Sequence, residues 1–288
     1  MRKIHVILIT MLIAAQGVRG VAQTTDVPAL GVCASLDKAN LLKQQGYQFI
    51  QPTVEEVLRP QLTNEAYQLS DTLVGQLPVA LAVCNVFIPG AIKTTGPDVD
   101  EARVMAYATR VFERARKQQI GTIVFGSGAS RNIPEGFDRD VARRQFVSMG
   151  RKLAELAATY HIVLALESQN KQECNFINTL RESIEIAKEV AHPNFRVTVD
   201  TYHMAMEKES PSHILLGKGY IHHCDIGELH NRAAPGVNGD DFTPYFQALQ
   251  HIGFHGKIAL ECRFVDMHTE LPKARQVIIK QWEEARSK

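Results

Sequence analysis

Four short apolar runs in the second half of the chain each lead into an acidic side chain, and this repetition restricts the fold more than any other feature. The runs end at Glu167, Asp200, Asp225 and Glu261, with gaps of 33, 25 and 36 residues. Each gap is long enough for the helical crossover that parallel strands require. Strands buried on both faces read as continuous apolar runs. The pattern therefore predicts neighbouring parallel strands whose carboxylates meet on one rim.

The first half of the chain adds four more strand-like runs, which alternate with helical patterns. They lie at 30–34, 47–50, 79–84 and 122–126. Eight strands alternating with helices favour a (β/α)8 TIM barrel over a doubly wound sheet. Barrels of this kind are typically about 250 residues long. We predict an α/β protein with one TIM-barrel domain over residues 23–288.

Residues 1–22 have the pattern of a secretory signal peptide. Met1-Arg2-Lys3 is basic, Ile4 to Ala15 is largely apolar, and Gly20 and Ala22 place small residues before a cleavage site. Signal peptides combine these three regions. The alternative is an N-terminal helix or membrane anchor. We expect an exported protein, in the periplasm, that leaves the membrane after the signal is removed.

Charge and cysteine content exclude other classes of protein. The formal net charge is +1 and no basic block is present, so we expect no nucleic-acid partner and no anionic membrane surface. The five cysteines are odd in number and show no CxxC spacing. They do not form a disulfide framework, and we interpret them as packing residues, as small buried thiols usually are.

The acidic side chains are candidates for metal binding and for acid–base chemistry. Glu167 and Glu261 have the same context, directly after Ala-Leu, while Asp200 and His203 form Asp-x-x-His past a strand. A lone glutamate in such a place is as often a cap or an ion-pair partner, but two make that interpretation weaker. Carboxylate and imidazole ligands on one rim suit a divalent metal.

The seventh strand offers several candidates, and strand alternation separates them. His223 and Asp225 share one face, while His222 and Cys224 share the other. If Asp225 points inward, it lies nearest the metal, His223 lies one step deeper, and His222 faces the helices. A slip of one residue in the register reverses this assignment.

Several motifs resemble the xylose isomerase-like barrel superfamily of sugar isomerases and epimerases. They include Val-Phe-Gly-Ser-Gly-Ala-Ser-Arg131, Val-Asp200-Thr-Tyr-His203-Met and Ala-Leu-Glu261-Cys-Arg. In the ketose 3-epimerases of that superfamily, two glutamates and an aspartate bind the metal, and the glutamates are also the acid–base pair. The resemblance implies these roles for Glu167, Asp200 and Glu261. It also implies substrate contacts for a further set, Glu173, His203 and Arg232.

The seventh strand departs from the family pattern, His-x-His-x-x-Glu, whose second histidine is the fourth ligand. Alignment on Glu228 puts His223 at the first histidine and Asp225 at the second. The fourth ligand is then Asp225, with His223 as the alternative. Four carboxylates favour manganese or magnesium, with cobalt also compatible and zinc less favoured.

These residues suit proton abstraction next to a carbonyl through an enediolate. Our first hypothesis is an exported, metal-dependent sugar isomerase or epimerase, whose partner is a small sugar or keto-glycoside. A lyase or hydratase of 3-keto-glycosides would use the same metal and glutamates. A non-catalytic sugar-binding barrel is a third hypothesis, and an endonuclease would need a basic face. A homo-oligomer is compatible with the sequence.

The first prediction concerns the mature chain. Mass spectrometry of the exported product should find Gln23 as the first residue, because signal peptidase cuts after small side chains such as Ala22. Recovery of exported protein with Met1 intact would contradict this prediction.

Overall fold

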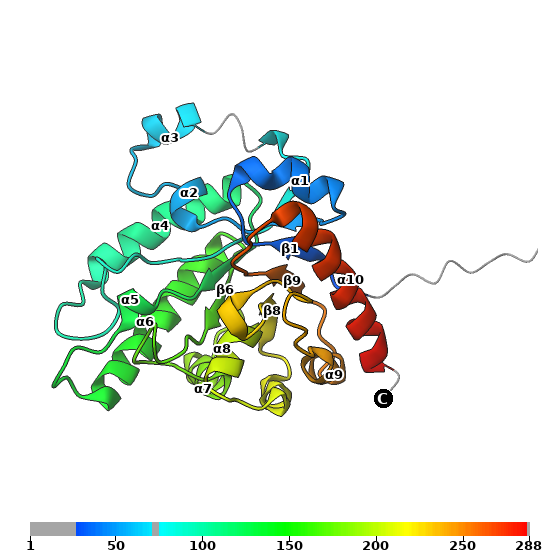
Figure 1. Ribbon diagram of the computed structural model, residues 1–288. Coiled ribbons are helices and arrows are strands. Elements are labelled where there is room, and N and C mark those ends of the chain that lie inside the picture. The colour runs from blue at the N-terminus through cyan, green and yellow to red at the C-terminus, as the bar shows by residue number, and fades with distance from the viewer. Residues whose placement is uncertain (1–26, 71–74, 287–288) are drawn as a thin grey trace, which may run out of the picture.

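The computed structural model describes residues 27–70 and 75–286, in which helices surround a barrel of parallel strands (Figure 1). The predicted signal peptide lies outside the described residues. No helix in the described part of the chain has both the length and the hydropathy needed to cross a membrane.

The described residues form nine strands, all joined by parallel pairings, in the order β3-β2-β1-β9-β8-β7-β6-β5-β4. The two ends of this order, β3 and β4, are separated only by Ala82, so the chain itself closes the barrel. The predicted strand over 79–84 is thus split in two, and the predicted single-domain TIM barrel is confirmed. The strands are β1 Leu30–Val32, β2 Phe49–Ile50, β3 Ala80–Leu81, β4 Val83–Cys84, β5 Thr122–Phe125, β6 Val163–Glu167, β7 Phe195–Asp200, β8 Ile221–Ile226 and β9 Lys257–Leu260.

Helices follow most strands and cover the outside of the barrel (Figure 1). The α-helices are α1 Ala39–Gln44, α2 Val54–Val57, α3 Asn64–Ser70, α4 Glu101–Lys117, α5 Gly128–Arg131, α6 Arg139–Thr159, α7 Leu180–Val190, α8 Thr201–Met206, α9 Thr243–His251 and α10 Met267–Arg286. Short 3-10 turns are η1 Leu36–Lys38, η3 Pro211–Gly217 and η4 His230–Arg232.

Side-chain caps begin two of the long helices, α6 and α7. Asp138 accepts a hydrogen bond from the backbone N–H of Val141, and Thr179 and Glu182 form a reciprocal capping box. These bonds satisfy N–H groups that a helix leaves unpaired in its first turn. At α9 the N-cap residue is Phe242, and the preceding Asp241 accepts a hydrogen bond from the backbone N–H of Thr243, the first helical residue, at 2.9 Å.

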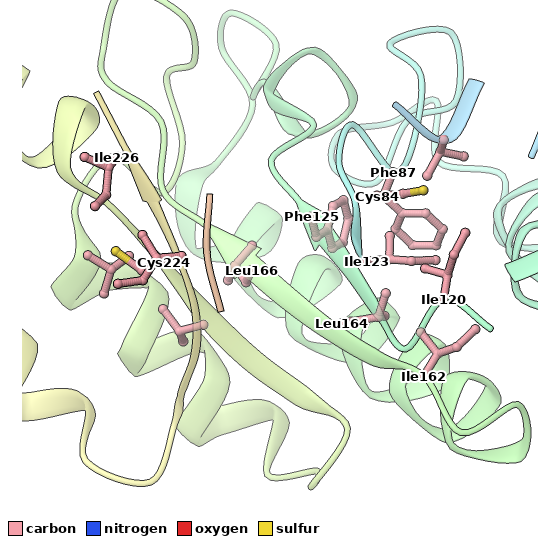
Figure 2. Close-up of a cluster of buried hydrophobic side chains, with 14 of the residues drawn as sticks. Cys84, Phe87, Ile120, Ile123, Phe125, Ile162, Leu164, Leu166, Cys224 and Ile226 are labelled. Carbon is pink, nitrogen blue, oxygen red and sulfur yellow. The ribbon is translucent and has the colours of Figure 1, made fainter. Parts of the chain in front are cut away.

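Apolar side chains pack between the strands and the helices. Figure 2 shows Leu164 and Leu166 of β6 in this layer, together with Cys224 and Ile226 of β8. The barrel interior holds a separate, smaller apolar group, Phe49, Val83, Val124 and Ala259. Because side chains alternate along a strand, the residue that follows a helix-facing residue points into the barrel.

This alternation fixes the direction of all four predicted carboxylates. Each follows a fully buried residue of the helix-facing layer; these residues are Leu166, Val199, Cys224 and Leu260. The carboxylates therefore turn toward the interior at the carboxyl ends of β6 to β9. Active sites of TIM barrels lie at that end of the barrel.

Candidate metal and acid–base site

The predicted carboxylates come together on four neighbouring strands, in two groups of potential metal ligands. One ligand atom from each of Glu167, Asp200 and His203 lies within 4.8 Å of the other two. Cys33, Asp225 and Glu261 form the second group by the same measure. Register joins the two groups, because Asp200 of β7 pairs with Asp225 of β8. The arrangement concentrates acidic side chains on one rim, as the sequence predicts.

Three of the four carboxylates have an oxygen that is buried and lacks a hydrogen-bond donor. These atoms are Glu167 Oε1, Asp225 Oδ2 and Glu261 Oε2, of which only Glu261 Oε2 has an ion-pair neighbour, Arg232. Glu167 is 4% exposed and Asp225 is fully buried. A buried carboxylate without a partner is costly, and oxygen-rich sites of this kind suit hard divalent cations. The residues present therefore fit a divalent metal.

Arg232 connects the two groups of ligands. Its Nη2 lies 2.7 Å from Asp200 Oδ2 and 3.2 Å from Glu261 Oε2, and its Nε donates to the backbone oxygen of Glu261 at 3.0 Å. The guanidinium also lies 4.9 Å from the ring centre of Tyr202. Asn231 and Arg232 both have positive φ, 60° and 50°, a conformation that non-glycine residues rarely adopt. This turn directs Arg232 into the site.

Asp225 is held by two buried neighbours through one of its oxygens. Gln51 Nε2 donates to Asp225 Oδ1 at 3.1 Å, and His223 Nε2 lies 3.1 Å from the same oxygen and 2.8 Å from Gln51 Oε1. Since both oxygens accept, the His223 ring carries its proton on Nε2. His223 thus supports Asp225 from below and leaves Oδ2 free for a cation.

His222 does not face the helices, so that expectation is wrong. Its Nε2 lies 3.0 Å from Oγ1 of Thr122, which shares the inner face of β5 with Val124. The pairing of β7 with β8 shifts register here and skips His222. A bulge of this kind inserts an extra residue and breaks strict alternation. His222 therefore points into the amino-terminal end of the barrel, below His223.

His203 and Glu173 lie beside the first group and are linked by Asn170. Asp200 is the N-cap of α8, and its Oδ1 accepts a hydrogen bond from the backbone N–H of His203 at 3.0 Å. His203 Nδ1 accepts a hydrogen bond from the backbone N–H of Asn170 at 3.3 Å and lies 2.9 Å from Asn170 Nδ2. The same Asn170 Nδ2 donates to Glu173 Oε1 at 3.0 Å. The neutral ring therefore has its proton on Nε2, 3.8 Å from Asp200 Oδ2.

Glu228 does not reach the ligand groups and instead anchors a loop. It is fully buried, and its carboxylate accepts the backbone N–H groups of Gly236, Asn238 and Gly239 at 2.6, 2.5 and 3.1 Å. A carboxylate with three such donors is well satisfied. Glu228 holds the loop that follows η4.

The Gly-Ser-Gly segment after β5 makes room for Glu167. A Cβ atom at Gly126 would overlap Glu167 Oε2. Arg131 lies buried beneath the same residue and donates to the backbone oxygens of Glu167 at 2.7 Å and Phe125 at 3.1 Å. The segment thus holds the end of β6 and adds a positive charge near the acidic rim.

The carboxyl groups of the site differ in pKa, which is raised for the two glutamates and lowered for Asp200. Burial raises the pKa of Glu167 well above its usual range, and Glu261, Asp200 and Asp225 add to the shift. Burial also raises the pKa of Glu261 to about 8, although Arg232 opposes it. Asp200 is the exception, since His203 and Arg232 overcome its burial and lower its pKa. A glutamate with a pKa of about 8 and a second glutamate with a raised pKa suit proton transfer.

Three polar residues from the first half of the barrel complete the rim, and our sequence analysis missed them. Cys33, Gln51 and Asn85 each directly follow a short buried strand, β1, β2 and β4. Cys33 Sγ lies 4.0 Å from Asp225 Oδ1, and Asn85 Nδ2 lies 3.9 Å from Cys33 Sγ. The rule that identified the glutamates, a polar residue directly after an apolar run, also marks these positions.

Two cavities at the opposite end of the barrel do not share these features. One of about 460 Å³ lies beside Trp282 and Lys257, and one of about 310 Å³ beside Thr122 and His222. Among the described residues, no carboxylate lines either cavity. The acid–base chemistry therefore belongs to the carboxyl-terminal rim.

Comparison with known proteins shows a family match and partial similarity to sugar epimerases. The sequence model of the family described as xylose isomerase-like TIM barrel matches residues 39–281. A D-psicose 3-epimerase of Ruminiclostridium cellulolyticum is 28% identical over 173 residues, which cover 58% of each chain. An L-ribulose 3-epimerase of Methylomonas sp. is 36% identical over 123 residues, which cover 41% of this chain and 42% of the relative. The matches thus span less than two thirds of these relatives.

The backbone resembles solved barrels over a greater length. The crystal structure of a 3-keto-D-glucoside 4-epimerase from E. coli has a TM-score of 0.67 and 18% identity, and the match covers 91% of this chain and 100% of that one. At this level of identity the likeness concerns the fold.

The second prediction separates Asp225 from His222. Asp225→Ala should weaken binding of Mn²⁺, measured by isothermal titration calorimetry, by about 10- to 100-fold or more, because it removes an inward-facing oxygen. His222→Ala is the matched control and should keep the affinity, since its side chain lies at the other end of the barrel. Equal losses in the two variants would contradict the assignment.

The third prediction concerns pH. Between pH 7 and 8 the metal-free folded protein retains part of the proton on Glu261, whose pKa is about 8, whereas an unfolded glutamate, with a pKa of about 4.3, has released it. Stability falls with pH wherever the folded state binds more protons. Thermal unfolding should therefore occur at a lower temperature at pH 8 than at pH 7. Both pH values lie above the ordinary pKa of histidine.

Two comparisons make this measurement specific. Adding Mn²⁺ should raise the unfolding temperature more at pH 8, where fewer protons compete with the metal. Glu261→Gln should flatten the pH dependence of the metal-free protein. A metal-free unfolding temperature that rises from pH 7 to pH 8 would be inconsistent with buried, protonated glutamates.

Proposed function

Because the chain belongs to the xylose isomerase-like TIM barrel family, we propose that it is a metal-dependent isomerase or epimerase of carbohydrates. The observation that carries this proposal is the pair of buried glutamates, Glu167 and Glu261, whose pKa values are raised beside unpaired carboxylate oxygens. The 3-epimerases of psicose and ribulose among the relatives support the same class of reaction.

The two glutamates supply the proton transfers. One takes the proton from the carbon next to the substrate carbonyl, and the other returns a proton to the opposite face or to the neighbouring carbon. Placing them on β6 and after β9, with β7 and β8 between, leaves a substrate on the rim accessible to both. Proton transfer by positioned carboxyl groups is worth roughly 100- to 10,000-fold in rate.

The remaining residues hold the metal and orient the substrate. Glu167, Asp200, Asp225 and Glu261 would bind the ion, which as a Lewis acid stabilises negative charge on the substrate oxygens. Glu173, His203 and Arg232 lie next to these ligands and provide the substrate contacts. Arg232 has five N–H donors in a planar arrangement that suits oxygen-rich ligands. The carboxylate set favours manganese or magnesium.

The proposed substrate is an unphosphorylated sugar or keto-glycoside. The proposed signal peptide would place the protein outside the cytoplasm, in the periplasm, away from free sugar phosphates. The rim supports this choice, because it collects four carboxylates around Arg232, and an anionic phosphate would be repelled there. No nucleic acid is expected, for the same electrostatic reason.

A second candidate is a lyase or hydratase of 3-keto-glycosides. Asp225 stands where the family pattern has a histidine, and the similar keto-glucoside epimerase supports a keto-glycoside substrate. Proton abstraction beside the keto group would then be followed by loss of the aglycone. Incubation with a 3-keto-glucoside separates the two functions, since a lyase releases free aglycone and an epimerase releases an epimeric sugar. A sugar-binding barrel would bind either compound without turnover.

The fourth prediction tests the two-glutamate mechanism. Glu167→Gln and Glu261→Gln should each reduce kcat by at least roughly 100-fold in a screen of ketoses and 3-keto-glucosides, because each change removes a proton carrier. Circular dichroism should show an unchanged fold. Glu283→Gln, on the exposed face of α10, is the matched control and should retain activity. Near-normal turnover in either site variant would refute the mechanism.

A further inference from the structure

We propose that Cys33 provides a sulfur ligand to the same divalent ion that Asp225 and Glu261 hold. This inference rests on the proposed function, because it concerns the metal of that site. Our sequence analysis interpreted Cys33 as a packing residue, and the family resemblance assigns it no role. The structure instead places its sulfur among acidic oxygens at the rim.

The position of Cys33 follows from the pairing of the first and last strands. β1 pairs with β9 so that Val32 lies beside Leu260, and the backbone N–H of Cys33 donates to the Leu260 oxygen at 2.9 Å. Val32 and Leu260 both belong to the helix-facing layer. By alternation, the next residue of each strand, Cys33 and Glu261, points into the barrel from the same level.

The distances suit binding of one ion. The potential ligand atoms of Cys33, Asp225 and Glu261 are all within 4.8 Å of one another. Metal–sulfur and metal–oxygen bonds of about 2.0 to 2.3 Å hold ligand atoms somewhat closer than this, so small side-chain movements would complete the site. Asp225 Oδ2 has no hydrogen-bond partner, which leaves it available. Glu261 Oε2 has an ion pair with Arg232 Nη2, at 3.2 Å, which a bound cation would replace.

The surroundings of the sulfur also fit a ligand. Asn85 Nδ2 lies 3.9 Å from Cys33 Sγ, and an amide donor stabilises the negative charge of a metal-bound thiolate. Gln51 and His223 occupy Asp225 Oδ1 and so direct the other oxygen toward the ion. Neighbours that orient a ligand in this way tune metal affinity. The thiol proton would leave to solvent as the metal–sulfur bond forms.

The other cysteines lack these features. Cys84, Cys174 and Cys224 are buried in the helix-facing apolar layer. Cys262 directly follows Glu261, but its Sγ donates to the Ile226 backbone oxygen at 3.2 Å. Cys33 alone among the five cysteines belongs to a group of potential metal ligands. Because all five cysteines are free, Cys262 is a suitable control for Cys33.

A sulfur ligand changes which metal the site prefers. The carboxylates alone favour hard ions such as manganese and magnesium. Thiolate is a soft donor that favours zinc and cobalt. We therefore expect Co²⁺ and Zn²⁺ to bind more tightly than the four-carboxylate set predicts.

Titration of the metal-free full chain with Co²⁺ tests this inference. Visible d–d absorption reports that cobalt is bound, and a near-ultraviolet charge-transfer band reports a cobalt–thiolate bond. Both should appear in the unmodified protein. Cys33→Ser should lose the charge-transfer band while keeping the d–d absorption. Cys262→Ser is the matched control and should keep both, and circular dichroism should show that each variant is folded.

The outcomes separate this inference from the proposed function. Cobalt binding without a charge-transfer band, or a band that survives in Cys33→Ser, overturns the sulfur ligand and leaves the metal site intact. Absence of any cobalt, zinc or manganese binding overturns the metal site and the sulfur ligand together. As a second readout, Cys33→Ser should weaken Zn²⁺ binding by about tenfold or more and should affect Mn²⁺ binding less.

Discussion

The crowding of buried carboxylates at the carboxyl ends of β6 to β9 is the constraint on which the rest of the site depends. Glu167, Asp200 and Asp225 are almost completely excluded from solvent, and Glu261 lies beside them. Like charges at such distances cannot all be ionised without a compensating cation. The site must therefore take up protons or a cation to relieve this electrostatic repulsion.

Neighbouring groups reduce this conflict without removing it. Arg232 neutralises Asp200 and approaches Glu261, and Arg131 adds a second buried guanidinium beneath Glu167. Their arrangement is uneven, so that the pKa of Asp200 is lowered while the pKa values of the two glutamates are raised. That difference assigns a fixed anionic ligand and two proton carriers within one set of carboxylates. It is the property that an epimerase or a related lyase would use.

The first half of the barrel contributes to the site through contacts with the second half. Gln51 and His223 fix one oxygen of Asp225, and Cys33 and Asn85 extend the same polar edge. The sulfur ligand proposed for Cys33 would explain how a site with Asp225 in place of a histidine keeps a softer donor. The barrel closes between β3 and β4, and its ninth strand pairs with its first, so these distant residues become neighbours.

The sequence alone determined the barrel, its strand positions and the four carboxylates, because continuous apolar runs and helical caps are local signals. Asp138 and the pair Thr179 and Glu182 are local signals that begin their helices. Alternation along the seventh strand placed His223 and Asp225 on one face, and the structure decided that this face points inward. Local patterns do not show where a bulge interrupts that alternation.

The remaining features were decided only by tertiary structure. The bulge at His222 depends on the pairing of β7 with β8, and it turned His222 toward Thr122 rather than toward the helices. Cys33 became a neighbour of Asp225 only when β1 paired with β9. Gly126 makes room for a carboxylate 41 positions along the chain, and Glu228 satisfies a loop rather than the metal. Contacts between segments far apart in sequence produce these roles, and no local pattern encodes them.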